Sequence, residues 1–175
     1  ILEQLFIVSN FSQNVKAVIF YVDSPGGEVT ACDDLFVKIV GLKARGIKTV
    51  AYVHGVSASG AYYATAFSDR MVASPTSIVG SIGVIIKFFN VQKLSRKIGV
   101  KMETIKSSEM KDVGSPFRKM SDRERIMFEN IIQHSFLRFK AIVELGRFMT
   151  DREIDETATG EIWNAEDAKT KHLVD

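Results

Sequence analysis

The sequence contains little cysteine, little net charge and no long apolar run. Cys32 is its single cysteine, so an internal disulfide is impossible. Its 23 basic and 21 acidic residues leave a net charge of +2, which does not indicate a nucleic-acid partner. No apolar run approaches the roughly 20 residues that span a bilayer. The three histidines (His54, His134 and His172) show no ligand spacing, so no metal and no cofactor are predicted.

The length and composition indicate one ordinary globular domain. The chain has 175 residues, of which 46% are hydrophobic, and it shows no repeat, low-complexity tract or linker. We therefore predict a single domain over residues 1–175. The sequence opens at Ile1, without an initiator methionine, and we expect a fragment from which an upstream N-terminal anchor is absent.

Short strands alternate with helices over the first two-thirds of the chain. The apolar run at 16–22 predicts a strand buried on both faces, and a helix is expected between Gly27 and Gly46. The other predicted elements are strands at 49–53, 71–73, 78–79 and 101–105, and helices at 62–67 and 90–99. This order predicts an α/β fold with a mostly parallel sheet.

The last third of the sequence is predicted to be helical. Residues 121–124 and 150–153 both have the pattern of a capping box, in which a hydroxyl and a glutamate satisfy each other's backbone amides. The first box opens a long helix that ends near Gly146, and Asn164 is expected to cap a final short helix.

Three glycine-marked turns are candidates for chemistry. Residues 23–27 (Asp-Ser-Pro-Gly-Gly) follow a strand, and their backbone N–H groups could stabilise an oxyanion; a tight strand-to-helix turn is the alternative. Ser59 follows another strand and precedes Gly60, so it could be an exposed nucleophile, although Ser57 or Ser59 could equally be a helix N-cap. Ser81 lies between two glycines, where a structural turn is the simpler interpretation.

A serine nucleophile requires a base, and the histidines are poorly placed to supply one. A lysine can replace histidine if apolar surroundings lower its pKa from the ordinary value of about 10.4. The segment 105–112 offers Lys106 and Lys111, and local sequence does not choose between them.

Four ordered motifs together resemble a known family. They are residues 24–27 (Ser-Pro-Gly-Gly), 58–63 (Ala-Ser-Gly-Ala-Tyr-Tyr), 80–84 (Gly-Ser-Ile-Gly-Val) and 111–112 (Lys-Asp). In this order they are similar to signal peptide peptidase A and SohB, the S49 group of serine peptidases. The likeness extends over essentially the whole chain. It departs from the family's usual pattern at Ala61 and at Ser107-Ser108, where the family usually has glycine at positions 61 and 108.

The resemblance implies a role for each matched residue. Ser59 would be the nucleophile, Lys111 the general base, and Ser81 the hydroxyl that orients the lysine amine. Gly26 and Gly60 would donate the N–H groups of the oxyanion hole. The implied enzyme is a serine endopeptidase that works through a Ser-Lys dyad and an acyl-enzyme.

The resemblance also implies a fold, substrates and a location. The fold would be the crotonase-like α/β superhelix that caseinolytic protease shares. The substrates would be remnant signal peptides and other hydrophobic peptides at the bacterial inner membrane, with the catalytic part on the extracytoplasmic side. Members of the family form homo-oligomeric rings or domes, in which the dyad can be completed across a subunit boundary.

Two other functions are compatible with the same fold. An acyl-CoA hydratase or isomerase would use glutamates for proton transfer, and Glu28 and Glu109 lie near the motifs in sequence. Such an enzyme has no need of Ser59 and Lys111. A non-catalytic membrane scaffold is the second alternative, and the presence of every dyad residue argues against it.

Overall fold

The computed structural model describes residues 14–175, which divide into two compact units. Unit 1 comprises the described residues up to 84 together with 136–175, and unit 2 comprises residues 85–135. The prediction that the chain folds as a single domain stays a prediction.

Unit 1 is built on a five-stranded sheet. Its order is β1 (Ala17–Ser24), β2 (Lys48–Ala58), β4 (Ile78–Gly80) and β5 (Ile162–Asn164), and β3 (Arg70–Ala73) also pairs with β2. All pairs are parallel except the pair of β4 with β5. The predicted α/β class with a mostly parallel sheet is confirmed; the sequence pattern did not predict β5.

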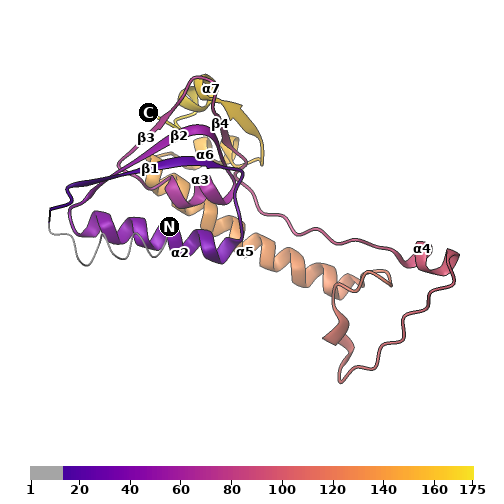
Figure 1. The fold of residues 1–175 in the computed structure, drawn as a ribbon. Helices are drawn as coiled ribbons and strands as arrows, with labels where there is room; N and C mark the ends of the chain where they lie inside the picture. Colours follow the sequence, from indigo (N-terminus) through magenta and orange to yellow (C-terminus); the bar gives the residue numbers. More distant parts are fainter. Residues whose placement is uncertain (1–13) are drawn as a thin grey trace. The chain divides into compact units, whose positions relative to one another are not determined.

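Helices α2 (Val29–Ala44) and α3 (Gly60–Thr65) lie against one face of β1 and β2 (Figure 1). Side chains from that face, such as Val22 and Val53, form the core with residues of α3. Ile19 and Tyr21 alternate with the core residues of β1 and are exposed. The expectation that this strand is buried on both faces is wrong, because the described helices cover only one of them.

The long helix α5 (Asp122–Arg147) begins where the first capping box predicts. Ser121 N donates to the Glu124 carboxylate at 2.7 Å, and Glu124 N donates to Ser121 Oγ at 3.3 Å. Both partners of the second box are also present at the start of α6 (Asp151–Thr157). Asn164 caps α7 (Ala165–Thr170) by accepting a hydrogen bond from Asp167 N.

Unit 2 contains a short helix, α4 (Gln92–Lys97), and a 3-10 turn, η1 (Glu109–Asp112), before α5 begins. The predicted strand at 101–105 is wrong, because these residues form no regular structure and have no strand to pair with among the residues described. Alternating polarity alone does not make a strand, since a strand needs a partner for its backbone groups. No described helix is long and apolar enough to cross a membrane.

Candidate active site

Ser59 lies between the end of β2 and the start of α3, in a strained backbone conformation. Its φ of 51° and ψ of −124° are unusual for a residue with a side chain, and such strain persists only where the surrounding structure enforces it. Its side chain makes no capping hydrogen bond to the helix. Ser59 is therefore not a capping residue in the usual sense, and its hydroxyl is available for other contacts.

Strand register places Ser81 next to Ser59. Ala58 of β2 is paired with Gly80 of β4, and each serine directly follows its paired residue. Ser59 N donates to Gly80 O at 2.9 Å. Ser81 also has a positive φ, 53°, and the turn that holds it is fixed by a bond from Ser81 N to Glu161 O at 2.6 Å. Two serines in strained conformations thus end two neighbouring strands.

The turn at Gly26 packs directly against the Ser59 turn. Gly26 has a φ of +116°, and a Cβ added there would lie 2.9 Å from both Gly60 N and Ser59 Cβ. Only glycine fits this position, for reasons of conformation and of space. The two predicted oxyanion glycines, Gly26 and Gly60, therefore lie together beside Ser59.

The N–H groups of this turn have different partners. Gly26 N donates to Ser24 Oγ at 3.2 Å, so it already has an acceptor. The neighbouring amide is also close, because a Cβ added at Gly60 would lie 3.1 Å from Gly27 N. Both amides of the Gly-Gly pair are thus close to the Ser59 turn.

Two tyrosines fix the helix that follows Ser59. Tyr62 is fully buried and donates from its hydroxyl to Leu173 O at 2.8 Å. Tyr63 donates to Asp33 of α2 at 2.5 Å, and the same carboxylate accepts a hydrogen bond from Arg138 at 2.6 Å. Asp33 and Arg138 carry no signal in the sequence, because contacts between residues so distant along the chain leave no local pattern.

Cys32 occupies the space beside the glycine turns. A Cβ added at Gly60 would lie 2.4 Å from Cys32 Sγ, and one added at Gly27 would lie 3.6 Å from it. Burial raises the pKa of the Cys32 thiol, and the charge of Glu28 raises it further. Cys32 is therefore a packing residue of this site in its neutral thiol form.

An apolar cavity of about 550 Å³ adjoins the glycine turns. It lies within unit 1 and extends from Gly26, Gly27 and Gly60 along β1, which pairs only with β2 among the described strands. Its apolar walls include Val22, Leu35 and Ala61. A cavity of this size, with few polar groups, suits an apolar side chain next to a reacting bond.

The structure separates the two lysine candidates, both of which lie in unit 2. Lys106 Nζ donates to Asp112 Oδ1 at 2.7 Å and to Glu109 O at 2.9 Å, so its amine is a charged donor in an ion pair. Lys111 on η1 is exposed, and its amine has no hydrogen bond or ion pair to the residues described. A base needs a free lone pair, and this favours Lys111.

The glutamates that a hydratase would require are engaged elsewhere. Both Glu28 carboxylate oxygens accept backbone amides of α2, from Thr30 at 2.9 Å and from Ala31 at 2.8 Å, and these bonds lower the pKa of Glu28. Glu109 forms an exposed ion pair with Arg123 at 3.7 Å. The lowered pKa keeps Glu28 in the ionised form, which does not suit a general acid. Among residues 14–175, no cluster of His, Cys, Asp and Glu is arranged to hold a metal ion.

Ser57, the other serine of this turn, has a buried hydroxyl without a partner. It is fully buried in β2, and its Oγ forms no hydrogen bond to the described residues. Since an unsatisfied buried hydroxyl is unfavourable, we expect Ser57→Ala to increase the free energy of unfolding by about 1 kcal/mol, measured by urea denaturation.

Ser77 provides the matched control for this stability prediction. Its Oγ is equally buried but donates to Val53 O at 3.0 Å, so Ser77→Ala should decrease the free energy of unfolding by about 1 kcal/mol. Equal destabilisation by both substitutions would show that the Ser57 hydroxyl has a stabilising partner after all.

Comparison with known proteins shows which family and which relatives the chain is similar to. The family model described as Peptidase family S49 matches residues 41–175. A protein of Methanocaldococcus jannaschii that is named as a protease is 40% identical over 93% of this chain and 52% of its own length. Protease 4 of Salmonella typhi is 33% identical over 92% of this chain and 26% of its own length. The chloroplastic serine protease SPPA of Arabidopsis thaliana is 34% identical over 94% of this chain and 24% of its own length. The chain thus spans between about a quarter and about half of these relatives' lengths.

Proposed function

Because the chain belongs to peptidase family S49, we propose that it is a serine endopeptidase with Ser59 as its nucleophile and Lys111 as its general base. The observation that carries this proposal is the assembly around Ser59. A strained serine without a capping bond lies beside a second strained serine, Ser81, and against the Gly26 turn. Strain at a residue enclosed by glycine turns is typical of a nucleophile held for attack.

The proposed reaction proceeds through an acyl-enzyme. Lys111 Nζ accepts the proton of Ser59 as Oγ attacks the scissile carbonyl, and Ser81 orients the lysine amine. The oxyanion is stabilised by the N–H of Gly60 and by an N–H of the first turn, from Gly26 or its neighbour. Lys111 then protonates the leaving amine. It next takes a proton from the water that hydrolyses the ester, and the returning proton restores the Ser59 hydroxyl.

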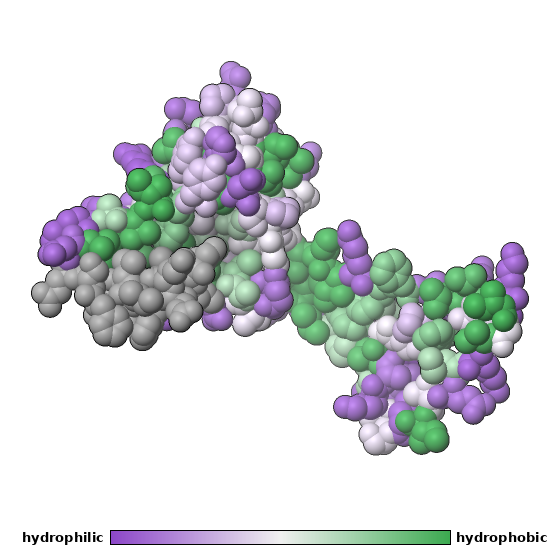
Figure 2. Space-filling model, in the orientation of Figure 1, coloured by the Kyte–Doolittle hydropathy of each residue, from purple (hydrophilic) through white to green (hydrophobic). Residues whose placement is uncertain are grey.

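A neutral lysine needs more enclosure than unit 2 provides by itself. Lys111 is exposed on η1, whereas a lysine base requires apolar surroundings. We expect the enclosure to come from a unit 1, belonging either to the same chain or to a second copy. Apolar residues also gather at the surface of unit 2 (Figure 2), and Phe89 and Ile105 are among the most exposed. Such exposure favours a homo-oligomer.

The proposed substrates are hydrophobic peptides, including remnant signal peptides. The apolar cavity beside Gly26 and Gly60 supports this choice, because it offers an apolar side chain a place next to the nucleophile. We further propose the crotonase-like superhelix as the wider fold. The enzyme would act on the extracytoplasmic side of the bacterial inner membrane, held there by an N-terminal anchor.

Covalent labelling tests the proposed nucleophile directly. We expect a fluorophosphonate to modify one residue, Ser59, as identified by mass spectrometry of the digested protein. The Ser59→Ala variant should take up no label, while Ser57→Ala should label like the wild type. Absence of labelling, in a preparation that also fails to cleave peptides, would instead support the non-catalytic scaffold.

A further inference from the structure

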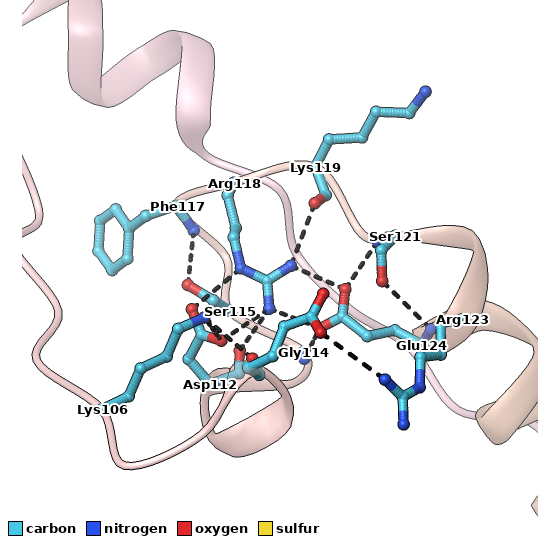
Figure 3. Close-up of polar contacts among 11 residues, drawn as sticks. Lys106, Asp112, Gly114, Ser115, Phe117, Arg118, Lys119, Ser121, Arg123 and Glu124 are labelled. Atoms are coloured by element: carbon cyan, nitrogen blue, oxygen red, sulfur yellow. Dashed lines mark hydrogen bonds and ion pairs between the residues drawn. The ribbon is translucent and has the colours of Figure 1, made fainter.

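We infer that Arg118 is a positioning residue for Lys111, acting through Asp112, and this inference rests on the proposed role of Lys111 as the base. Figure 3 shows the Arg118 guanidinium between the carboxylates of Asp112 and Glu124, with Lys106 on the far side of Asp112. All these residues belong to unit 2. None of them is required to touch the substrate.

The turn that carries Lys111 is held only weakly by its own backbone. η1 has four residues, and its bonds are long: Lys111 N to Ser108 O is 3.2 Å, and Val113 N to Met110 O is 3.3 Å. A 3-10 turn of this length has poor hydrogen-bond geometry. The position of Lys111 therefore depends on side-chain contacts from outside the turn.

Asp112, the residue directly after Lys111, receives those contacts. Arg118 Nε donates to Asp112 Oδ2 at 3.0 Å, and Arg118 Nη2 donates to Asp112 Oδ1 at 3.0 Å. Arg118 Nη2 also donates to the Asp112 backbone carbonyl at 2.9 Å. Lys106 Nζ adds a bond to Oδ1 at 2.7 Å. Three contacts from one planar guanidinium fix both the side chain and the backbone of Asp112.

Glu124 connects this arrangement to a rigid element. Its side chain is only 2% exposed, and it accepts Arg118 Nη2 at 2.6 Å and Arg118 Nη1 at 2.7 Å. Glu124 lies in the first turn of α5, and it also accepts Ser121 N, which fixes it to the start of that helix. The bonds from Arg118 hold the pKa of both carboxylates well below the usual range, so the network stays charged at neutral pH. A 26-residue helix thus fixes η1, and with it the base, through one arginine.

Because of this arrangement, we expect the loss of Arg118 to lower the rate of catalysis and not only the stability. If Arg118 is lost, η1 is free to shift, and a displacement of about 1 Å at a reacting group can cost on the order of 100-fold in rate. We expect Arg118→Met to lower kcat by about 10- to 100-fold while KM stays within about twofold, since the apolar cavity in unit 1 is unchanged. Arg118→Lys should recover part of the rate, because it keeps one charged bond but not the planar fork.

The matched control is Arg123, whose ion pair with Glu109 touches the same turn. That pair is exposed and 3.7 Å long, so Arg123→Met should leave kcat within about twofold of the wild type. Lys106→Met removes one of the bonds to Asp112 and should have a smaller effect than Arg118→Met.

The experiment measures kcat, KM and the thermal midpoint of unfolding for these variants of the intact protein, with Lys111→Met alongside. Because Arg118→Met leaves Glu124 buried without its partner, the double variant Arg118→Met/Glu124→Gln is included to keep the unit folded.

A folded double variant with reduced kcat, unchanged KM and partial recovery in Arg118→Lys supports the inference. A folded double variant with wild-type kcat, beside an inactive Lys111→Met, overturns it. If the double variant does not fold, Arg118→Lys decides: wild-type kcat there, beside inactive Lys111→Met, also overturns it. Wild-type activity of Lys111→Met would overturn the proposed base itself.

Discussion

Peptide cleavage should be lost when Ser59 is replaced by Ala or Lys111 by Met, with kcat lower by about 10³-fold or more in each case. Ser59→Ala removes the attacking oxygen, and Lys111→Met removes the only group that we propose to take its proton. Because the two act as a unit, the double variant should be no slower than either single variant. The measurement is steady-state cleavage of an apolar peptide by the intact protein.

The two neighbouring side chains of the same types serve as controls. Ser57→Ala should keep wild-type kcat, since its hydroxyl is buried in β2, and Lys106→Met should lose far less activity than Lys111→Met. Wild-type activity in Ser59→Ala would exclude Ser59 as the nucleophile. An inactive Lys106→Met beside a fully active Lys111→Met would transfer the role of base to Lys106.

Gly26→Ala should have the second largest effect, lowering kcat/KM by about 100-fold or more. Its new Cβ would lie 2.9 Å from Gly60 N and from Ser59 Cβ, at a φ of +116° that alanine rarely adopts. The turn must shift away from Ser59, and this separates the proposed oxyanion donors from the nucleophile. We also expect a loss of about 2 kcal/mol in the free energy of unfolding, measured by urea denaturation.

Gly46→Ala is the matched control for this substitution. Gly46 also has a positive φ, +77°, but a Cβ added there would contact nothing within 4 Å. Its kcat/KM should therefore stay within about threefold of the wild type. If both substitutions reduced activity equally, the close approach of Gly26 to the Ser59 turn would not explain the effect.

The strand beside the cavity supports the substrates that we propose. The cavity beside Gly26 runs along β1, which pairs only with β2 among the described strands. An edge strand offers unpaired backbone groups to an extended chain, while the cavity accepts a side chain. Extended apolar segments meet both conditions, in agreement with the substrates that we propose.

Local sequence determined the elements that depend on neighbouring residues. The capping boxes at Ser121 and Thr150 and the Asn164 cap appear as predicted, because each requires partners within three residues. The strands of the parallel sheet were also recognisable, since their apolar runs and the turns after them are local features. The glycine turns indicate Gly26, Ser59, Gly60 and Ser81 as separate candidates, and the resemblance to the S49 peptidases joins them in one predicted site.

Tertiary structure decided everything that depends on contacts between distant segments. The pairing of β2 with β4 places Ser81 beside Ser59, and the sequence pattern does not predict the register of that pairing. The strand expected at 101–105 fails because no partner strand is available to it in the described chain, and β5 forms because β4 offers it an edge. The resemblance implies Lys111 as the base, and tertiary contacts support that proposal, because the Asp112 carboxylate engages Lys106 while the Lys111 amine has no partner among the described residues. Hydrogen bonds between residues a few positions apart can be predicted from the sequence. Contacts between residues distant in sequence depend on how the whole chain packs.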